Sequence, residues 1–223
     1  MPCLCSIHAD NIRDLTEDEL KIYFSPLNLD TNDKSLIKST NRKLHYDHDE
    51  GVKYKFDQPT SVNSRIFNTE NKEPIYFKVN QQRFKLIEFH FHDHAENIIN
   101  NDRQAMEVHF VFADSENPSD LAVLGYIFEE NTQKHAKSSE MIRRLRKNKR
   151  FDLPKIKQYF TFSGALTKPP GYPIPQVAVA WHVSTDYLEI SSDDLAYFRT
   201  NFCRQSADVQ PRNARNISLI KAK

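Results

Sequence analysis

Three histidines on two neighbouring segments are the residues of this chain whose types and spacing best suit chemistry. In FKLIEFHFH, a strand would alternate its side chains, so His90 and His92 project from one face with Glu88 beside them. A His-x-His pair alone is weak evidence for a metal, because histidines also pack and hydrogen-bond in half-buried sheets. The segment MEVHFVF adds His109, on a strand that can return as the antiparallel neighbour of the first. We therefore expect three imidazoles to converge.

Strand alternation also predicts which side chains share each face. On the first strand, the histidine face would carry Phe84, Leu86, Glu88, His90 and His92, and the opposite face Lys85, Ile87, Phe89 and Phe91. On the second strand, one face would carry Glu107, His109 and Val111, and the other Val108 and Phe110. Two carboxylates are thus expected close to the histidines.

This set of side chains predicts a catalytic zinc site, with Zn²⁺ held by His90, His92 and His109. Three neutral imidazoles leave a tetrahedral zinc one open position for water, and they would also accept cobalt. Glu88 and Glu107 can each accept the second ring N–H of a neighbouring histidine, which fixes the tautomer. A polar network without metal would leave these carboxylates in a sheet interior without a cation, which is costly.

The elements that must position these residues are short strands, with few helices. Strands are predicted at Val52 to Phe56, Ile75 to Val79, Phe84 to His92, Met106 to Phe112, Leu121 to Phe128 and Val177 to Val183. Helices are predicted around Thr16 to Ile22, at Ser138 to Lys147 and at Ser191 to Phe202. With 223 residues, no repeat and only 4 glycines, the chain is expected to form one mainly β domain.

Composition excludes several classes of protein. Lys plus Arg number 31 against 30 Asp plus Glu, so neither nucleic acid nor an acidic membrane surface is an expected partner. No apolar run approaches the roughly 18 residues of a membrane span, and the first residues turn acidic before any signal-like apolar core develops. The three cysteines, Cys3, Cys5 and Cys203, do not resemble a disulfide framework. We expect a cytoplasmic protein.

Two charged stretches can each be interpreted either as solvent-exposed structure or as a functional site. Residues 134–150 carry eight Lys or Arg residues, which form either a solvated helix face or a docking site for an anionic partner. The cluster of His45, Asp47, His48, Asp49 and Glu50 contains metal-ligand types, but its turn-like sequence lacks the spacing that would aim them together. We read this cluster as an exposed polar turn.

The chemistry-bearing segments resemble the alpha-carbonic anhydrase family, whose His-x-His strand and Glu-x-His strand correspond here to EFHFHDHAEN and MEVHFVF. Their separation matches the shorter, bacterial-like members. Further matches follow in the family's order: SPLNLDT, Asn63, LAVLGYIF, FSGALTKPP, VAVAWHV, SSDDLAYFRTNF and QPRNARNI. The resemblance implies a single-domain, large twisted, mostly antiparallel sheet of about ten strands with a few short peripheral helices. Residues 22–223 would be the catalytic domain and 1–21 an N-terminal extension.

The resemblance also implies zinc-dependent, reversible hydration of carbon dioxide to bicarbonate and a proton, by attack of zinc-bound hydroxide. Thr167 would accept a hydrogen bond from that hydroxide and donate its own proton to Glu96. Carbon dioxide would rest on an apolar wall formed by Val111, Val123, Leu166 and Trp181.

Several positions depart from the family's pattern. Arg65 stands where fast members carry the proton-shuttle histidine, and a guanidinium that stays protonated cannot relay a proton, so slower turnover is expected. His94 either replaces that relay or has only a surface role. Lys168 replaces a small hydroxyl and either binds bicarbonate or reaches solvent. Glu88 replaces a common Gln, and Gly171 replaces a disulfide cysteine, which fits a reducing location.

Two alternatives to this enzyme remain. One is a catalytically impaired, carbonic anhydrase-like zinc-binding protein that serves as an interaction module. The retained ligands together with Thr167 and Glu96 argue against it, since a module has no need of them. The other is a zinc hydrolase that uses the same water on an ester, and the apolar wall favours carbon dioxide over that substrate.

Overall fold

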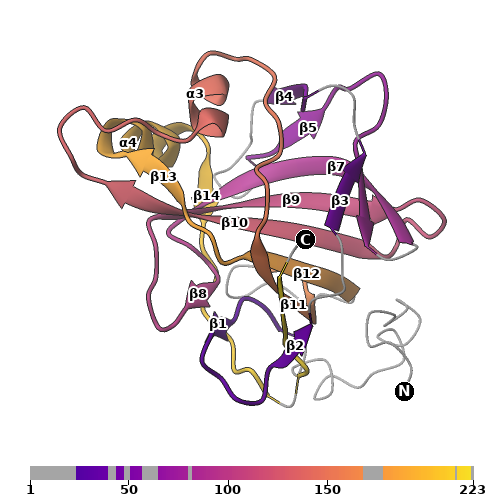
Figure 1. Cartoon of the computed structure of the whole chain (residues 1–223). Helices are drawn as coiled ribbons and strands as arrows, with labels where there is room; N and C mark the ends of the chain where they lie inside the picture. Colours follow the sequence, from indigo (N-terminus) through magenta and orange to yellow (C-terminus); the bar gives the residue numbers. More distant parts are fainter. Residues whose placement is uncertain are drawn as a thin grey trace.

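A computed structural model of the chain describes residues 24–39, 44–47, 51–56, 65–79, 82–167, 178–213 and 215–221 (Figure 1). Several sequence predictions lie outside these residues. They concern the 1–21 extension, the helix at Thr16 to Ile22, and Cys3, Cys5, His48, Asp49, Glu50, Asn63, Lys168 and Gly171. The expected turn was wrong for His45 and Asp47, because both lie on a strand that pairs with residues 76–79.

A sheet of thirteen strands forms the body of the molecule (Figure 1). Nine strands follow one path, in the order β2 (Ile37–Ser39), β15 (Ser218–Lys221), β11 (Gln158–Ala165), β12 (Ala178–Ser184), β10 (Leu121–Asn131), β9 (Met106–Asp114), β7 (Gln82–Asp93), β5 (Phe67–Thr69) and β4 (Tyr54–Phe56). The others are β3 (Leu44–Asp47), β6 (Tyr76–Val79), β13 (Leu188–Ser191) and β14 (Cys203–Gln205). A separate parallel pair joins β1 (Asn28–Leu29) to β8 (Ile98–Ile99).

Most strand pairings in the large sheet are antiparallel, which confirms the predicted fold class. The parallel pairings are β10 with β12, β10 with β13, β14 with β7 and β15 with β2. The predicted long strands are present, and β7, β9 and β10 extend beyond their predicted ends. Prediction missed the eight-residue strand β11, and the other missed strands are two to four residues long, too short to show an alternating pattern.

In the described part of the chain, two helices lie at the edge of the sheet, one where a capping serine predicted it and one where helical spacing did. Helix α4 (Ser192–Asn201) begins after Ser191, whose hydroxyl accepts a hydrogen bond from the Asp194 N–H. Helix α3 (Glu140–Arg146) buries Met141, Ile142 and Leu145. No helix in the described part of the chain is long and apolar enough to cross a membrane.

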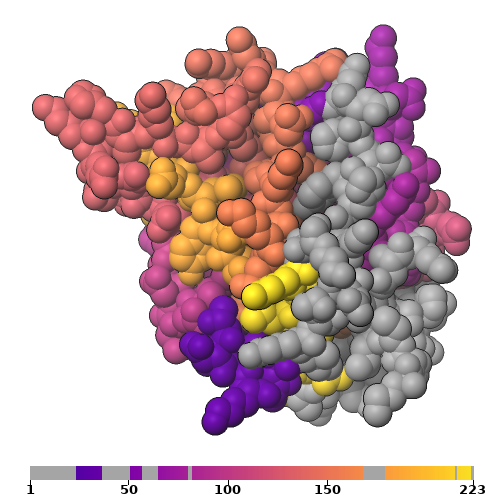
Figure 2. All heavy atoms as spheres, in the orientation of Figure 1, coloured from indigo at the N-terminus to yellow at the C-terminus, as the bar shows by residue number. Residues whose placement is uncertain are grey.

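The basic segment 134–150 includes the loop after β10 and helix α3. Figure 2 shows this loop standing out from one side of the molecule. Arg143 and Arg144 pair with Glu140 on the same helix, and Arg146 pairs with Asp194 at 3.1 Å while stacking on the Tyr197 ring. These contacts are those of a solvated helix face, and an anionic partner stays a prediction.

The two faces of the sheet bury different kinds of side chain. One face packs an aromatic core that includes Phe89, Phe110 and Phe128. The other packs a smaller aliphatic cluster, with Val111 and Val123 beside Trp181. Side chains of β9 alternate between these faces as predicted, because Val108 belongs to the aromatic core and Val111 to the aliphatic cluster.

Strand β7 does not keep the strict alternation that the sequence suggested. In its pairing with β9, Leu86 faces Phe112 and Glu88 faces Val111, so Ile87 is an extra residue in a β-bulge. Phe84 and Leu86 therefore pack in the aromatic core with Phe89 and Phe91, and their assignment to the histidine face was wrong. The bulge shifts the alternation, so that Phe84 and Leu86 before it and Phe89 and Phe91 after it share the core face, while Glu88, His90 and His92 share the other.

We expect the aromatic core to carry much of the stability. Phe89 is fully buried and its ring lies 4.7 Å from Phe67 and 5.3 Å from Phe110, so Phe89→Ala should lower the free energy of unfolding by about 3–5 kcal/mol. Ile87→Ala on the same strand is the matched control, because Ile87 is 40% exposed, and it should cost less than about 1 kcal/mol. Denaturant unfolding monitored by circular dichroism measures both, and equal losses would contradict this assignment.

Candidate metal centre

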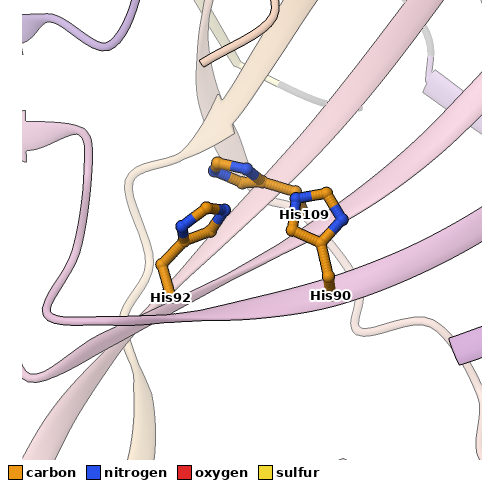
Figure 3. Close-up of side chains that lie close together, drawn as sticks. All are labelled: His90, His92 and His109. Carbon is orange, nitrogen blue, oxygen red and sulfur yellow. The ribbon is translucent and has the colours of Figure 1, made fainter. Parts of the chain in front are cut away.

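Three histidine rings meet on the aliphatic side of the sheet (Figure 3). His90 and His92 stand side by side on β7, and the β7–β9 register sets His109 opposite His90. The ring centroids are 5.0 Å apart for His90 and His92, 5.5 Å for His90 and His109, and 4.7 Å for His92 and His109. One nitrogen from each ring lies within 4.8 Å of the others, and all three side chains are buried.

The second nitrogen of each ring lies close to an oxygen that can orient the ring. His90 Nδ1 lies 3.1 Å from Glu88 Oε1, and His109 Nε2 lies 3.0 Å from Glu107 Oε1. His92 Nδ1 lies 3.3 Å from the Gln205 carbonyl and 3.1 Å from Glu96 Oε1. These contacts leave His90 Nε2, His92 Nε2 and His109 Nδ1 as the atoms available to a metal.

The free nitrogens fit a bound cation. His92 Nε2 is buried and has no hydrogen-bond partner among the described residues, a state that costs roughly 1–3 kcal/mol unless a ligand occupies the site. Burial lowers the pKa of both His90 and His92 well below the usual value, and the charge of Arg204 adds to this effect. Both rings are therefore neutral at physiological pH, which is the form that coordinates zinc.

His109 differs from the other two rings because carboxylates surround it. Burial alone would lower its pKa, but the adjacent Glu107 and, more weakly, Glu96 outweigh burial and raise it. Glu107 is fixed in turn, since its carboxylate accepts hydrogen bonds from the Asn97 N–H at 2.8 Å and the Asn97 side-chain amide at 2.9 Å. Glu107 favours a proton on Nε2, so a metal would displace the second proton of the ring, at Nδ1.

Gly125 on β10 makes room for that carboxylate. It pairs with His109 across the β9–β10 ladder, and a Cβ atom at this position would come within 2.7 Å of Glu107 Oε1. Any side chain at residue 125 would therefore push Glu107 away from the histidine. Sequence reasoning missed this residue, although a glycine inside a strand is itself a signal of close approach.

Glu96 and Thr167 are brought together beside the histidines. Glu96 is 1% exposed, and its Oε1 atom accepts a hydrogen bond from the Ala207 N–H at 2.6 Å. Burial raises the pKa of Glu96, while His109 and a hydrogen bond with the Thr167 side chain oppose that rise. The hydroxyl of Thr167 is thus held by a carboxylate that itself has a fixed orientation.

The apolar residues predicted to line the site share one cluster. Val111, Val123 and Trp181 are buried together, and Leu166 packs against them. The Trp181 ring lies 5.0 Å from the His109 ring, and its N–H donates to the Ala165 carbonyl at 3.0 Å. An apolar wall therefore adjoins the histidine cluster.

The two residues considered for proton transfer have other contacts. Arg65 donates from Nη1 to the Cys203 carbonyl at 2.9 Å and to the Arg199 carbonyl at 3.4 Å, so its guanidinium is engaged by backbone. His94 lies at the surface, with 56% of its side chain exposed, and its Nδ1 is 3.1 Å from Asp93 Oδ1. The structure does not bring His94 into the group of three histidines.

Comparisons with known proteins agree on one family. Residues 22–222 match the model of the eukaryotic-type carbonic anhydrase family. A carbonic anhydrase of Nostoc sp. is 28% identical over 72% of this chain and 64% of its own length, and one of Neisseria gonorrhoeae is 34% identical over 62% and 57%. The chain thus spans less than two thirds of these relatives. An alpha-carbonic anhydrase structure from Thermovibrio ammonificans, in complex with the inhibitor sulfanilamide, has a TM-score of 0.69, 25% identity and coverage of 97% and 96%.

The histidine cluster predicts a specific loss of metal. His109→Ala removes one of three converging nitrogens, so zinc affinity should fall by more than about 100-fold, a larger effect than losing an outer contact. His182→Ala is the control, because His182 is equally buried but contacts Phe77 on the aromatic side. Competition with a chelator measures affinity, and zinc retained by His109→Ala would contradict the site.

Gly125→Ala should weaken zinc binding by about 10–100-fold through displacement of Glu107. Glu107→Gln should act in the same direction. If both act through one contact, the double variant will bind zinc no more weakly than the worse single variant. Additive losses in the chelator competition would show that Gly125 acts elsewhere.

Proposed function

Because this chain belongs to the eukaryotic-type carbonic anhydrase family, we propose that it catalyses the zinc-dependent, reversible hydration of carbon dioxide to bicarbonate and a proton. The observation that carries the proposal is the set of three buried imidazoles with one free nitrogen each. His90, His92 and His109 would hold the metal, and Glu88, Glu107 and the Gln205 carbonyl would orient the rings. Three protein ligands leave a fourth position open, as in catalytic zinc sites.

The metal would supply one piece of chemistry, which is to lower the pKa of a coordinated water to about 7, the value characteristic of carbonic anhydrases. The protein's own groups control what happens around that nucleophile. The neutral state of His90 and His92 preserves their lone pairs for coordination, and burial is the main cause of that neutrality.

Thr167 and Glu96 would orient the attacking oxygen. Glu96 is acceptor for the Ala207 N–H and for the Thr167 hydroxyl, so the hydroxyl proton points to the carboxylate. The lone pairs of the Thr167 oxygen are then left to accept a hydrogen bond from the nucleophile. This fixes the direction of attack without a proton transfer by Thr167 itself.

The apolar wall of Val111, Val123, Leu166 and Trp181 suits carbon dioxide. The substrate is small and uncharged, so it loses little solvation when it leaves water for an apolar surface. Bicarbonate is charged and gains nothing from the same surface. The wall therefore favours entry of the substrate and departure of the product.

Export of the proton is the step for which the chain is least equipped. Arg65 is bound to two backbone carbonyls and keeps its charge, so we propose that it does not relay protons. His94 stays a prediction as an alternative relay, as do binding of bicarbonate by Lys168, the boundaries at residue 22 and the cytoplasmic location. We propose a turnover lower than that of members with a shuttle histidine.

Stopped-flow hydration of carbon dioxide by the zinc-loaded protein tests the proposal. Thr167→Val should lower kcat/KM by roughly 10²–10³-fold while zinc stays bound, because the oriented hydrogen bond is lost. Thr185→Val is the matched control, since that hydroxyl bonds to the Gln158 carbonyl away from the histidines, and its activity should not change. Bound zinc without hydration in the unmodified protein would instead favour the interaction-module alternative.

A further inference from the structure

Arg204 is a cationic residue on the histidine face that the proposed mechanism does not use. It lies on β14, which pairs in parallel with β7 and places Arg204 opposite His92. Its neighbour Cys203 pairs with Phe91 and is buried in the aromatic core. Since successive residues of a strand face opposite sides, Arg204 is directed to the side of the sheet that carries the histidines.

Hydrogen bonds with Arg65 hold the base of this side chain. Arg204 Nε donates to the Arg65 carbonyl at 2.8 Å, while Arg65 Nη1 donates back to the Cys203 carbonyl at 2.9 Å. Among the described residues, the two Nη atoms of Arg204 have no hydrogen-bond partner. The side chain is partly exposed. Arg204 therefore presents two Nη groups that are held in place by the Nε hydrogen bond and can donate to a ligand.

Strand pairing places Arg204 beside the candidate metal centre, because Arg204 and the metal-ligand candidate His92 are register partners on neighbouring strands. Burial lowers the pKa of Arg204 itself, and Glu88 and Glu96 counter that change. A cation on the strand next to a metal ligand, and on the same face of the sheet, can act on an anion bound there.

We propose that Arg204 is an anion-binding residue of this site, which takes a small planar oxyanion, bicarbonate, between its free Nη donors and the metal. The planar fork of a guanidinium matches the paired oxygens of carboxylate-like anions, and a cation is needed where several carboxylates already surround the histidines. The proposal rests on the proposed function for the identity of the anion. Its consequence is tighter product binding, and therefore slower release, than the apolar wall alone would give.

Titration of the cobalt-substituted protein with bicarbonate, followed by its visible absorption spectrum, tests the proposal without using turnover. Arg204→Gln should raise the bicarbonate Kd by roughly fivefold to tenfold, because one nearby charge and two donors are lost. Arg204→Lys keeps the charge and should change the Kd by no more than about twofold to threefold. Lys155→Gln, which removes one exposed charge from the loop before β11, controls for net charge and should leave the Kd unchanged.

An unchanged Kd in Arg204→Gln with normal cobalt content overturns the proposal, and so does a Kd raised equally by Lys155→Gln. If Arg204→Gln does not fold, NMR of the unmodified protein labelled with ¹⁵N-arginine decides the matter. The Arg204 Nε–H resonance should shift on addition of bicarbonate, and its failure to shift at saturation overturns the proposal. Carbon dioxide hydration is measured separately, so a protein that binds bicarbonate but does not hydrate carbon dioxide refutes the proposed function and leaves the Arg204 result to stand.

Discussion

The pairing of β7 with β9 is the constraint on which the rest of the site depends. The register sets His90 opposite His109, and His92 follows two residues later on the same face. The bulge at Ile87 is part of that constraint, because it brings Glu88 into line with the histidines while Phe84 and Leu86 remain in the aromatic core. A slip of one residue would send the imidazoles into the core and phenylalanines into the site.

Much of the fold and of the site could be predicted from spacing alone. The convergence of His90, His92 and His109 follows from alternation on two adjacent strands, and the long strands other than β11 follow from apolar periodicity. The bulge could not be anticipated, since Ile87 fits a regular strand and only pairing with β9 reveals the extra residue. The orienting groups from Gln205 and Ala207 are backbone atoms, which any residue carries. Arg204 lies on a strand of three residues, too short to predict a face.

Electrostatics explain why so many carboxylates surround one cluster. Glu96 and Glu107 are almost fully buried, and each is held by backbone N–H donors from a neighbouring segment. Such groups are tolerated when they pair with cations or accept fixed hydrogen bonds. Here they stabilise ring tautomers and favour a divalent cation among the rings. The polar network and the apolar wall occupy the same face of the sheet. The groups that orient the histidine rings therefore lie within a few side chains of an apolar surface that solvates charge weakly.

Strand β14 joins residues that are more than a hundred positions apart along the chain. The Gln205 carbonyl of this strand bonds to His92, and the N–H of Ala207 just after the strand bonds to Glu96. Residues from the last fifth of the sequence therefore complete the surroundings of the histidines. During synthesis on a ribosome, the segment with all three histidines emerges well before those partners do. The histidines are therefore synthesised before the strands that supply their hydrogen-bond partners. Until the carboxy-terminal strands dock, the imidazoles of a nascent chain lack the partners that fix their tautomers.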